Sequence, residues 1–138
     1  MITRELAEAL AARGLPWTPV AGDRFVVPDR DLDDEVFVVS GMSVEVADLP
    51  YGAEMRFNGT VEWALDSIAQ SEVVWLPRED QLRAALGERF VALEAVPGGC
   101  AVVLRVPDGR AEGQTTTARH VDIDAERAYA RALLSVLD

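Results

Sequence analysis

The stretch that most constrains this chain runs from Val73 to Leu82 and reads VVWLPREDQL. Its apolar, β-branched and aromatic start predicts a buried strand, and its second half predicts a helix. Pro77 is expected at the first helical position, where proline is tolerated, and Glu79 and Asp80 suit the positive end of the helix dipole. We therefore expect a strand–helix joint between two halves of the chain.

Apolar periodicity and end signals predict helices at residues 3–13, 61–70, 78–86 and 125–137. Strands are predicted at residues 24–27, 35–39, 43–48, 54–58, 73–76, 90–96, 100–106 and 114–119. The expected order is α-ββββ-α-β-α-βββ-α, an α+β fold of mostly antiparallel sheet with about four helices. We expect a single domain over residues 1–138. One sheet covered by helices is favoured over a structural repeat of two meanders.

The composition restricts the class of partner. The formal net charge of −11 argues against nucleic acid and anionic membrane surfaces, which both bind basic faces. All 13 cationic residues are arginines, so Schiff-base chemistry and a standard P-loop, which need lysine, are excluded. The N-terminal residues predict no signal peptide, so we expect a cytoplasmic protein without a membrane segment.

The most acidic segment contains a possible cation loop. Asp29, Asp31 and Asp33 have the spacing of the first three acidic ligands of a calcium loop. The glycine and the bidentate glutamate of that loop are missing, since Ser40 stands at the glutamate position. A solvated acidic loop is therefore favoured over a weak cation site.

Catalytic and cofactor signals are weak. His120 is the only histidine and Cys100 the only cysteine, so a usual zinc site cannot be built and a Cys–His pair depends on these two alone. Cys100 is expected to be a small buried hydrophobe, and His120 to serve structure or solvent contact. The sequence favours a non-catalytic role over an enzyme and indicates no cofactor or metal.

Side chains suited to ligand or partner contact gather at the ends of the middle segment: Asn58, Trp63, Trp75 and Arg78. Asn58 precedes a glycine at a strand end, where a turn explains it better than a ligand does. The two tryptophans suit a pocket wall, a partner contact or the core, because tryptophan is enriched in interfaces and is also well buried. Arg78 is the remaining candidate for function.

Three segments, residues 24–39, 56–67 and 75–82, resemble a group of small uncharacterised actinobacterial proteins that are often labelled "pilus assembly protein CpaE". That label describes a larger ATPase with a P-loop. The present chain has no P-loop, so the resemblance implies no residue roles.

The sequence thus predicts a protein-interaction or accessory module with an acidic surface, whose partner is another protein or a second copy of itself in a homodimer. Residues 1–70 hold 13 acidic residues against five arginines, which suits a basic partner. The alternative is a small-molecule-binding protein or enzyme with a cleft near Trp63, Trp75 and Arg78. A flat apolar patch favours the module, and a deep pocket holding Arg78 favours the alternative.

Overall fold

The computed structural model describes residues 1–28, 35–39, 43–49, 52–58, 67–69, 73–110 and 112–137, with only the backbone given between 43 and 69. The chain divides into two compact units. We call Met1–Leu15 with Pro77–Asp138 the helix–sheet unit, and Pro16–Leu76 the middle unit. Their boundary coincides with the strand–helix joint expected from sequence. The α+β class is confirmed, whereas the single domain stays a prediction.

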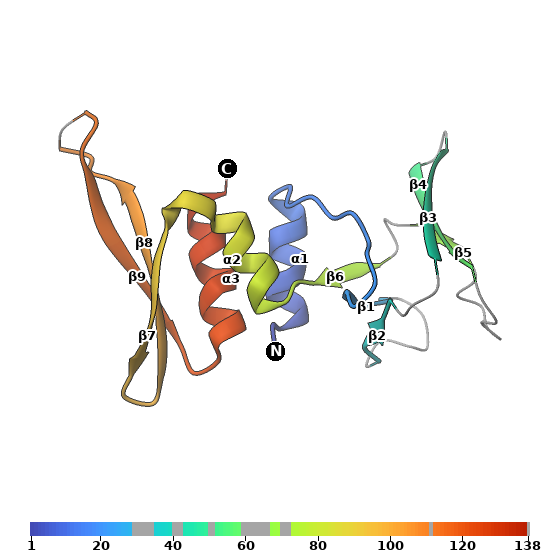
Figure 1. The fold of residues 1–138 in the computed structure, drawn as a ribbon, viewed down its shortest axis with the longest axis horizontal. Helices are drawn as coiled ribbons and strands as arrows, with labels where there is room; N and C mark the ends of the chain where they lie inside the picture. Colours follow the sequence, from blue (N-terminus) through green and yellow to red (C-terminus); the bar gives the residue numbers. More distant parts are fainter. Residues whose placement is uncertain are drawn as a thin grey trace. The chain divides into compact units, whose positions relative to one another are not determined.

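The helix–sheet unit is a three-stranded antiparallel sheet with its helices on one side (Figure 1). The strand order is β7-β8-β9, so β8 is central and the other two are edges. Helix α3 packs on β8 and β9, and helices α1 and α2 pack on α3. The elements are α1 (Arg4–Ala12), α2 (Glu79–Leu86), the 3-10 helix η2 (Gly87–Arg89), β7 (Phe90–Val96), β8 (Gly99–Pro107), β9 (Thr115–Asp122) and α3 (Ala125–Val136).

Local sequence signals explain where these elements begin and end. Thr3 caps α1 by accepting a hydrogen bond from the Leu6 amide at 3.2 Å, as its position predicts. Asp124 caps α3 in the same way. Gly87 ends α2 with a φ of 57°, a left-handed angle that favours glycine. The predicted helices at 3–13, 78–86 and 125–137 are therefore confirmed, with small shifts of their ends.

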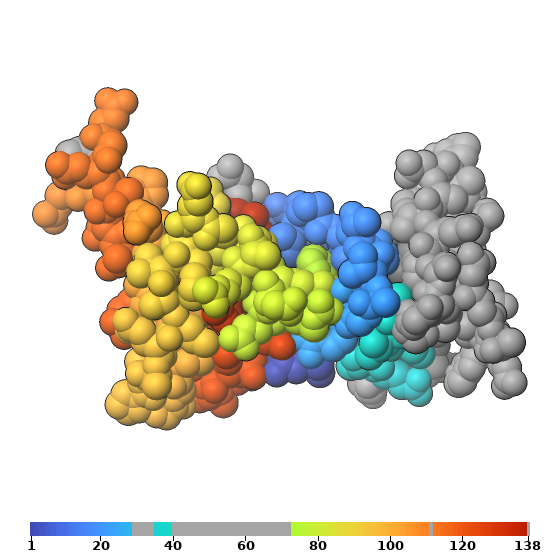
Figure 2. Space-filling view, in the orientation of Figure 1, coloured from blue at the N-terminus to red at the C-terminus, as the bar shows by residue number. Residues whose placement is uncertain are grey.

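The core of this unit lies between the sheet and the helices. Tyr129 is 1% exposed, and its ring stacks on Phe90 with centroids 5.7 Å apart. Arg83 places its guanidinium 4.4 Å from the centre of the same Phe90 ring. Further buried side chains come from every layer: Ile2, Ala7, Leu10, Leu82, Leu86, Val102, Leu104, Ala128, Ala132 and Leu133. Towards its tip, the β8–β9 hairpin projects clear of this core (Figure 2).

The middle unit contains two small antiparallel sheets. Strands β1 (Arg24–Val26), β2 (Phe37–Val38) and β6 (Val74–Leu76) form one in the order β2-β1-β6. Strands β3 (Ser43–Leu49), β4 (Gly52–Asn58) and β5 (Ser67–Ala69) form the other in sequence order.

The core of the first sheet is aromatic and β-branched. Phe25, Val27, Val39 and Val73 are buried together, and Trp17 packs against them, as expected of a core residue. Asp23 is fully buried and accepts hydrogen bonds from Trp17 Nε1 at 2.8 Å and from the Val20 amide at 3.0 Å. These bonds compensate for removing the carboxylate from water.

The predicted helix at 61–70 is wrong over residues 67–69. These residues form β5 and pair with β4, where Met55 aligns with Ile68. The apolar spacing of the segment suits a helix, but β4 offers an open row of backbone groups, and tertiary pairing overrides local propensity. Residues 61–66 and 70 lie outside the described residues. Across the part of the chain that is described there are three α-helices instead of four.

The expected single sheet is also wrong, because the described strands form three separate sheets. Strand β1 pairs with β2 on one side and with the distant β6 on the other, so Phe25 lies opposite Trp75. Pro77 is not the first helical residue either. Arg78 is the N-cap of α2, so Pro77 precedes the helix. No described helix is both long and apolar enough to span a bilayer.

Candidate interaction surface

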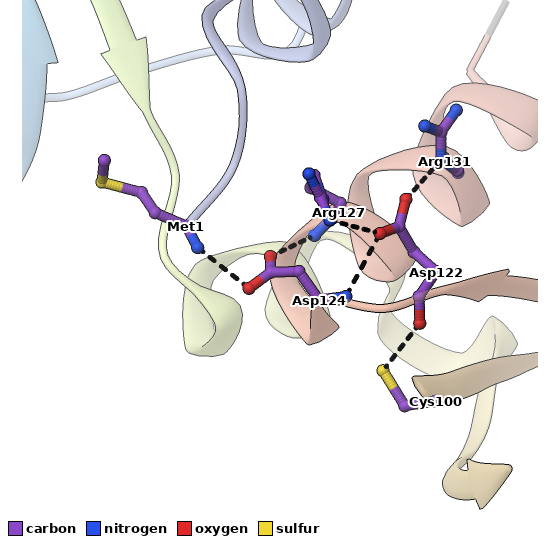
Figure 3. A network of polar contacts seen from close by, with 6 residues as sticks. All are labelled: Met1, Cys100, Asp122, Asp124, Arg127 and Arg131. Atoms are coloured by element: carbon purple, nitrogen blue, oxygen red, sulfur yellow. Dashed lines mark hydrogen bonds and ion pairs between the residues drawn. The ribbon is translucent and has the colours of Figure 1, made fainter. Parts of the chain in front are cut away.

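Three polar side chains join the end of β9 to α3 (Figure 3). The Asp122 carboxylate contacts Arg127 Nη2 at 2.9 Å through Oδ1 and Arg131 Nε at 2.9 Å through Oδ2. Its Oδ1 also accepts a hydrogen bond from the Asp124 amide at 3.1 Å. Burial alone would raise the pKa of Asp122, but the hydrogen bonds and the two arginines more than offset it, so the pKa is lowered. Asp122 is therefore ionised, and its ion pairs link the end of β9 to α3.

The first residues of the chain are attached to the same helix start. The Met1 α-amino group lies 2.9 Å from Asp124 Oδ1, and the Ile2 amide donates to Glu126 Oε1 at 3.1 Å. The Asp124 pKa is lowered, since its bonds with the amino group and the Arg127 amide outweigh the opposing effect of burial. These groups satisfy one another, which gives the cluster a structural role.

Cys100 and His120 lie on the same face of the sheet as Asp122, because Cys100 aligns with Asp122 and Val102 with His120. Cys100 Sγ is 3.6 Å from the Asp122 backbone oxygen. Burial, and then the nearby carboxylates, raise the pKa of the thiol, which opposes thiolate formation. Burial lowers the pKa of His120. Neither shift matches an activated Cys–His pair, whose thiol pKa is depressed.

The opposite face of the sheet carries small and β-branched side chains beneath one ion pair. Arg119 on β9 reaches Glu94 on β7 across the central strand, with Nη2 and Oε2 2.7 Å apart. Ala101 and Val103 lie between them on β8 and are 0% and 6% exposed. Glu94 is thus neutralised within its own sheet.

Large apolar side chains are exposed on both edge strands of this sheet. On β7 these are Val91 at 43% and Leu93 at 39%, and at the end of β9 they are Val121 at 57% and Ile123 at 77%. Leu93 is exposed because α3 packs mainly on β8 and β9 and meets β7 at its first residue, Phe90. The β7 pair and the β9 pair lie on opposite edges of the sheet, with β8 between them, and Leu93 and Val121 lie on opposite faces. We call the four residues together the sheet-edge patch. Exposed apolar side chains mark binding surfaces when they gather on one element, and each edge carries one such pair.

The sequence did not point to the sheet-edge patch. The alternation of residues 90–96 predicts a strand correctly, but a period of two does not reveal which strand becomes an edge. For β9 the signal was stronger, since its polar composition predicts an edge position, and this is confirmed.

The sequence-predicted contact residues fall in different places. Trp75 belongs to the middle unit and stacks on Trp17, with centroids 5.8 Å apart and planes 4° apart. Its Nε1 is buried and has no hydrogen-bond partner among the described residues. Trp63 and the acidic-loop residues Asp29, Asp31 and Asp33 lie outside the described residues, and the side chain of Asn58 is likewise not described.

Arg78 belongs to the helix–sheet unit and is engaged locally. Its Nε lies 3.1 Å from Asp80 Oδ1, and its amide donates to Gln81 Oε1 at 2.9 Å. The helix beside it borders a wide-open hollow of about 420 Å³, lined by Glu79, Asp80 and Arg83. The described residues contain no cluster of three or more His, Cys, Asp or Glu side chains suited to a metal ion.

No protein-family model, curated protein or solved structure matches this chain. The resemblance to the actinobacterial proteins therefore stays a prediction.

Proposed function

We propose that this protein is a protein-interaction or accessory module that acts through the sheet of its helix–sheet unit. The observation that supports the proposal is the sheet-edge patch, Val91, Leu93, Val121 and Ile123. Covering apolar surface with a partner contributes about 25 cal/mol of binding free energy for each Å² removed from water. Their position on edge strands adds backbone groups that a partner can bond.

The charge distribution differs between the two units and supports a different role for each in binding a partner. Residues 16–76 hold 12 acidic residues against three arginines, whereas the helix–sheet unit holds 12 against ten. The middle unit thus supplies most of the negative field, which attracts a basic protein surface over long range. The helix–sheet unit is nearly neutral and permits close apolar contact.

The test is capture of partners by chemical cross-linking and mass spectrometry in cells, with wild type and the double variant Val121→Arg, Ile123→Ser as baits. We expect partners bound by wild type to be lost from the variant. Val20→Ser is the matched control, because Val20 is 53% exposed but lies in the middle unit. Equal capture by all three proteins, together with a strict monomer in solution, would refute the proposal.

A second candidate is small-molecule binding near Trp75, the alternative that includes Trp63 and Arg78. The observation favouring it is the buried indole N–H of Trp75, which no described residue accepts. A buried donor left unbonded costs about 1–3 kcal/mol, so an acceptor on a ligand would be favourable there. A fragment screen that follows the Trp75 indole proton by NMR tests this; no perturbed indole signal would remove the candidate.

A further inference from the structure

Among the described residues of the helix–sheet unit, β7 is an edge strand with few of the features that normally protect such edges. Charged residues, proline or a covering element usually block edge pairing. Between Phe90 and Val96 the only charged residue is Glu94, and Arg119 of the same sheet neutralises it. A register shift between Phe90 and Ala92 is the only irregularity of the β7–β8 pairing. The other edge, β9, carries three threonines, an arginine, a histidine and an aspartate.

We propose that β7 pairs antiparallel with β7 of a second copy, joining two three-stranded sheets into one of six strands. This rests on the proposed function and specifies one partner and one surface for it. The pairing is isologous, with a two-fold axis at Leu93, so each copy contributes the same residues.

The exposure pattern of β7 requires the two-fold axis to pass through a residue and not between two residues. Exposure alternates along the strand, and Val91, Leu93 and Ala95 are its exposed positions. Facing residues of antiparallel strands lie on the same side of a sheet, so exposed positions must meet exposed positions. A centre at Leu93 sets Leu93 opposite its own copy and Val91 opposite Ala95.

Neighbouring registers are worse on chemical grounds. A centre at Glu94 sets two carboxylates directly opposite, which is destabilising. A centre at Ala92 places the two-fold axis next to the register shift between Phe90 and Ala92, where an extra residue disrupts regular strand pairing. With the centre at Leu93, Glu94 faces Ala92 and keeps its own Arg119.

Charge opposes a second copy less at this surface than elsewhere on the chain. A net charge of −11 on each chain opposes association in general. The helix–sheet unit contributes little of that charge, with 12 acidic residues and ten arginines, and β7 contributes none once Glu94 is paired. The β7 edge is therefore a place where two copies can approach without a large electrostatic cost.

The pairing is tested by sedimentation velocity across a concentration series. We expect wild type to dimerise, and Leu93→Lys and Leu93→Glu to be monomeric, because each variant sets like charges opposite at the two-fold axis. A rise of roughly tenfold or more in the dimer Kd corresponds to about 1.4 kcal/mol or more. Mixing tagged Leu93→Lys with untagged Leu93→Glu should restore pairing, with the untagged chain co-purifying.

Thr116→Lys is the control on the opposite edge, β9, and should remain dimeric. Unchanged circular dichroism and melting temperature of each variant verify that it folds. A wild type that stays monomeric, or Leu93 variants that dimerise separately, would overturn β7 pairing. If Thr116→Lys alone dissociates the dimer, β7 pairing is wrong while the interaction module survives. A monomer that still captures partners through Val121 and Ile123 likewise separates the two proposals.

Discussion

Asp122 Oδ2 accepts a hydrogen bond from Arg131 Nε at 2.9 Å, which joins the last residue of β9 to the middle of α3. Asp122 has only 9% of its side chain exposed, whereas Arg131 is 51% exposed. The carboxylate therefore depends on its partners more than Arg131 does. Replacing it should weaken the docking of α3 on the sheet.

Asp122→Asn should lower the free energy of unfolding by about 2 kcal/mol, a typical value for hydrogen bonds to charged groups. Chemical denaturation measures this loss. Asp108→Asn is the control, because Asp108 accepts a turn hydrogen bond at an exposed site and should change stability little. An equal loss in both variants would contradict a specific role for Asp122.

The Asp122 contribution should also depend on pH. Its pKa is lower in the folded protein than in the unfolded chain, whose value is about 3.9. The unfolded state thus takes up the proton first on acidification, and stabilisation present above the unfolded pKa is lost as pH falls through the folded one. The stability difference between wild type and Asp122→Asn should be constant near neutral pH and shrink below about pH 4.

His120 should titrate below its ordinary pKa of about 6.5, because burial disfavours the imidazolium. As the only histidine, it can be followed alone by NMR. The folded protein binds the His120 proton less readily than the unfolded chain does. The free energy of unfolding is therefore unaffected by His120 above the unfolded-state pKa, and it falls as the pH decreases towards the folded-state pKa. His120→Asn should remove this dependence. A pKa at or above the ordinary value would contradict the burial argument.

Gly99→Ala should destabilise the protein by about 2 kcal/mol, within the range for overpacking. A Cβ at Gly99 would collide with the Asp122 backbone oxygen and lie 3.0 Å from Ile123 Cα, and backbone cannot move aside as a side chain tip can. Gly109→Ala is the matched control, since nothing lies within 4 Å of its Cβ. Thermal melting distinguishes the two; similar melting temperatures would be unexpected.

Cys100 should react slowly with a disulfide reagent at neutral pH. Burial raises its pKa, and Asp124 and Asp122 add to the rise, so little thiolate forms. The rate should rise with pH and on unfolding in guanidinium chloride. A folded-state rate equal to that of the unfolded chain would show that the thiol is neither shielded nor shifted in pKa.

Local chemistry was sufficient to predict much of the helix–sheet unit. Thr3 marks the start of α1, Gly87 marks the end of α2, and Pro97-Gly98 forms the turn between β7 and β8. Each signal acts within a few residues of the chain and needs no distant partner.

Strand pairing and exposure were decided by the tertiary structure. Ser67–Ala69 is a strand because β4 lies beside it, although its local apolar spacing suits a helix. Likewise β1 pairs with β6, some fifty residues away, and no local sequence pattern indicates that pairing. Leu93 is exposed because α3 packs mainly on β8 and β9 and meets β7 at Phe90, the first residue of that strand. By itself the sequence determined the places of α1, α2 and α3 and of the Pro97-Gly98 turn, since those depend on near neighbours. Long-range packing determined which strands pair and which apolar side chains face water.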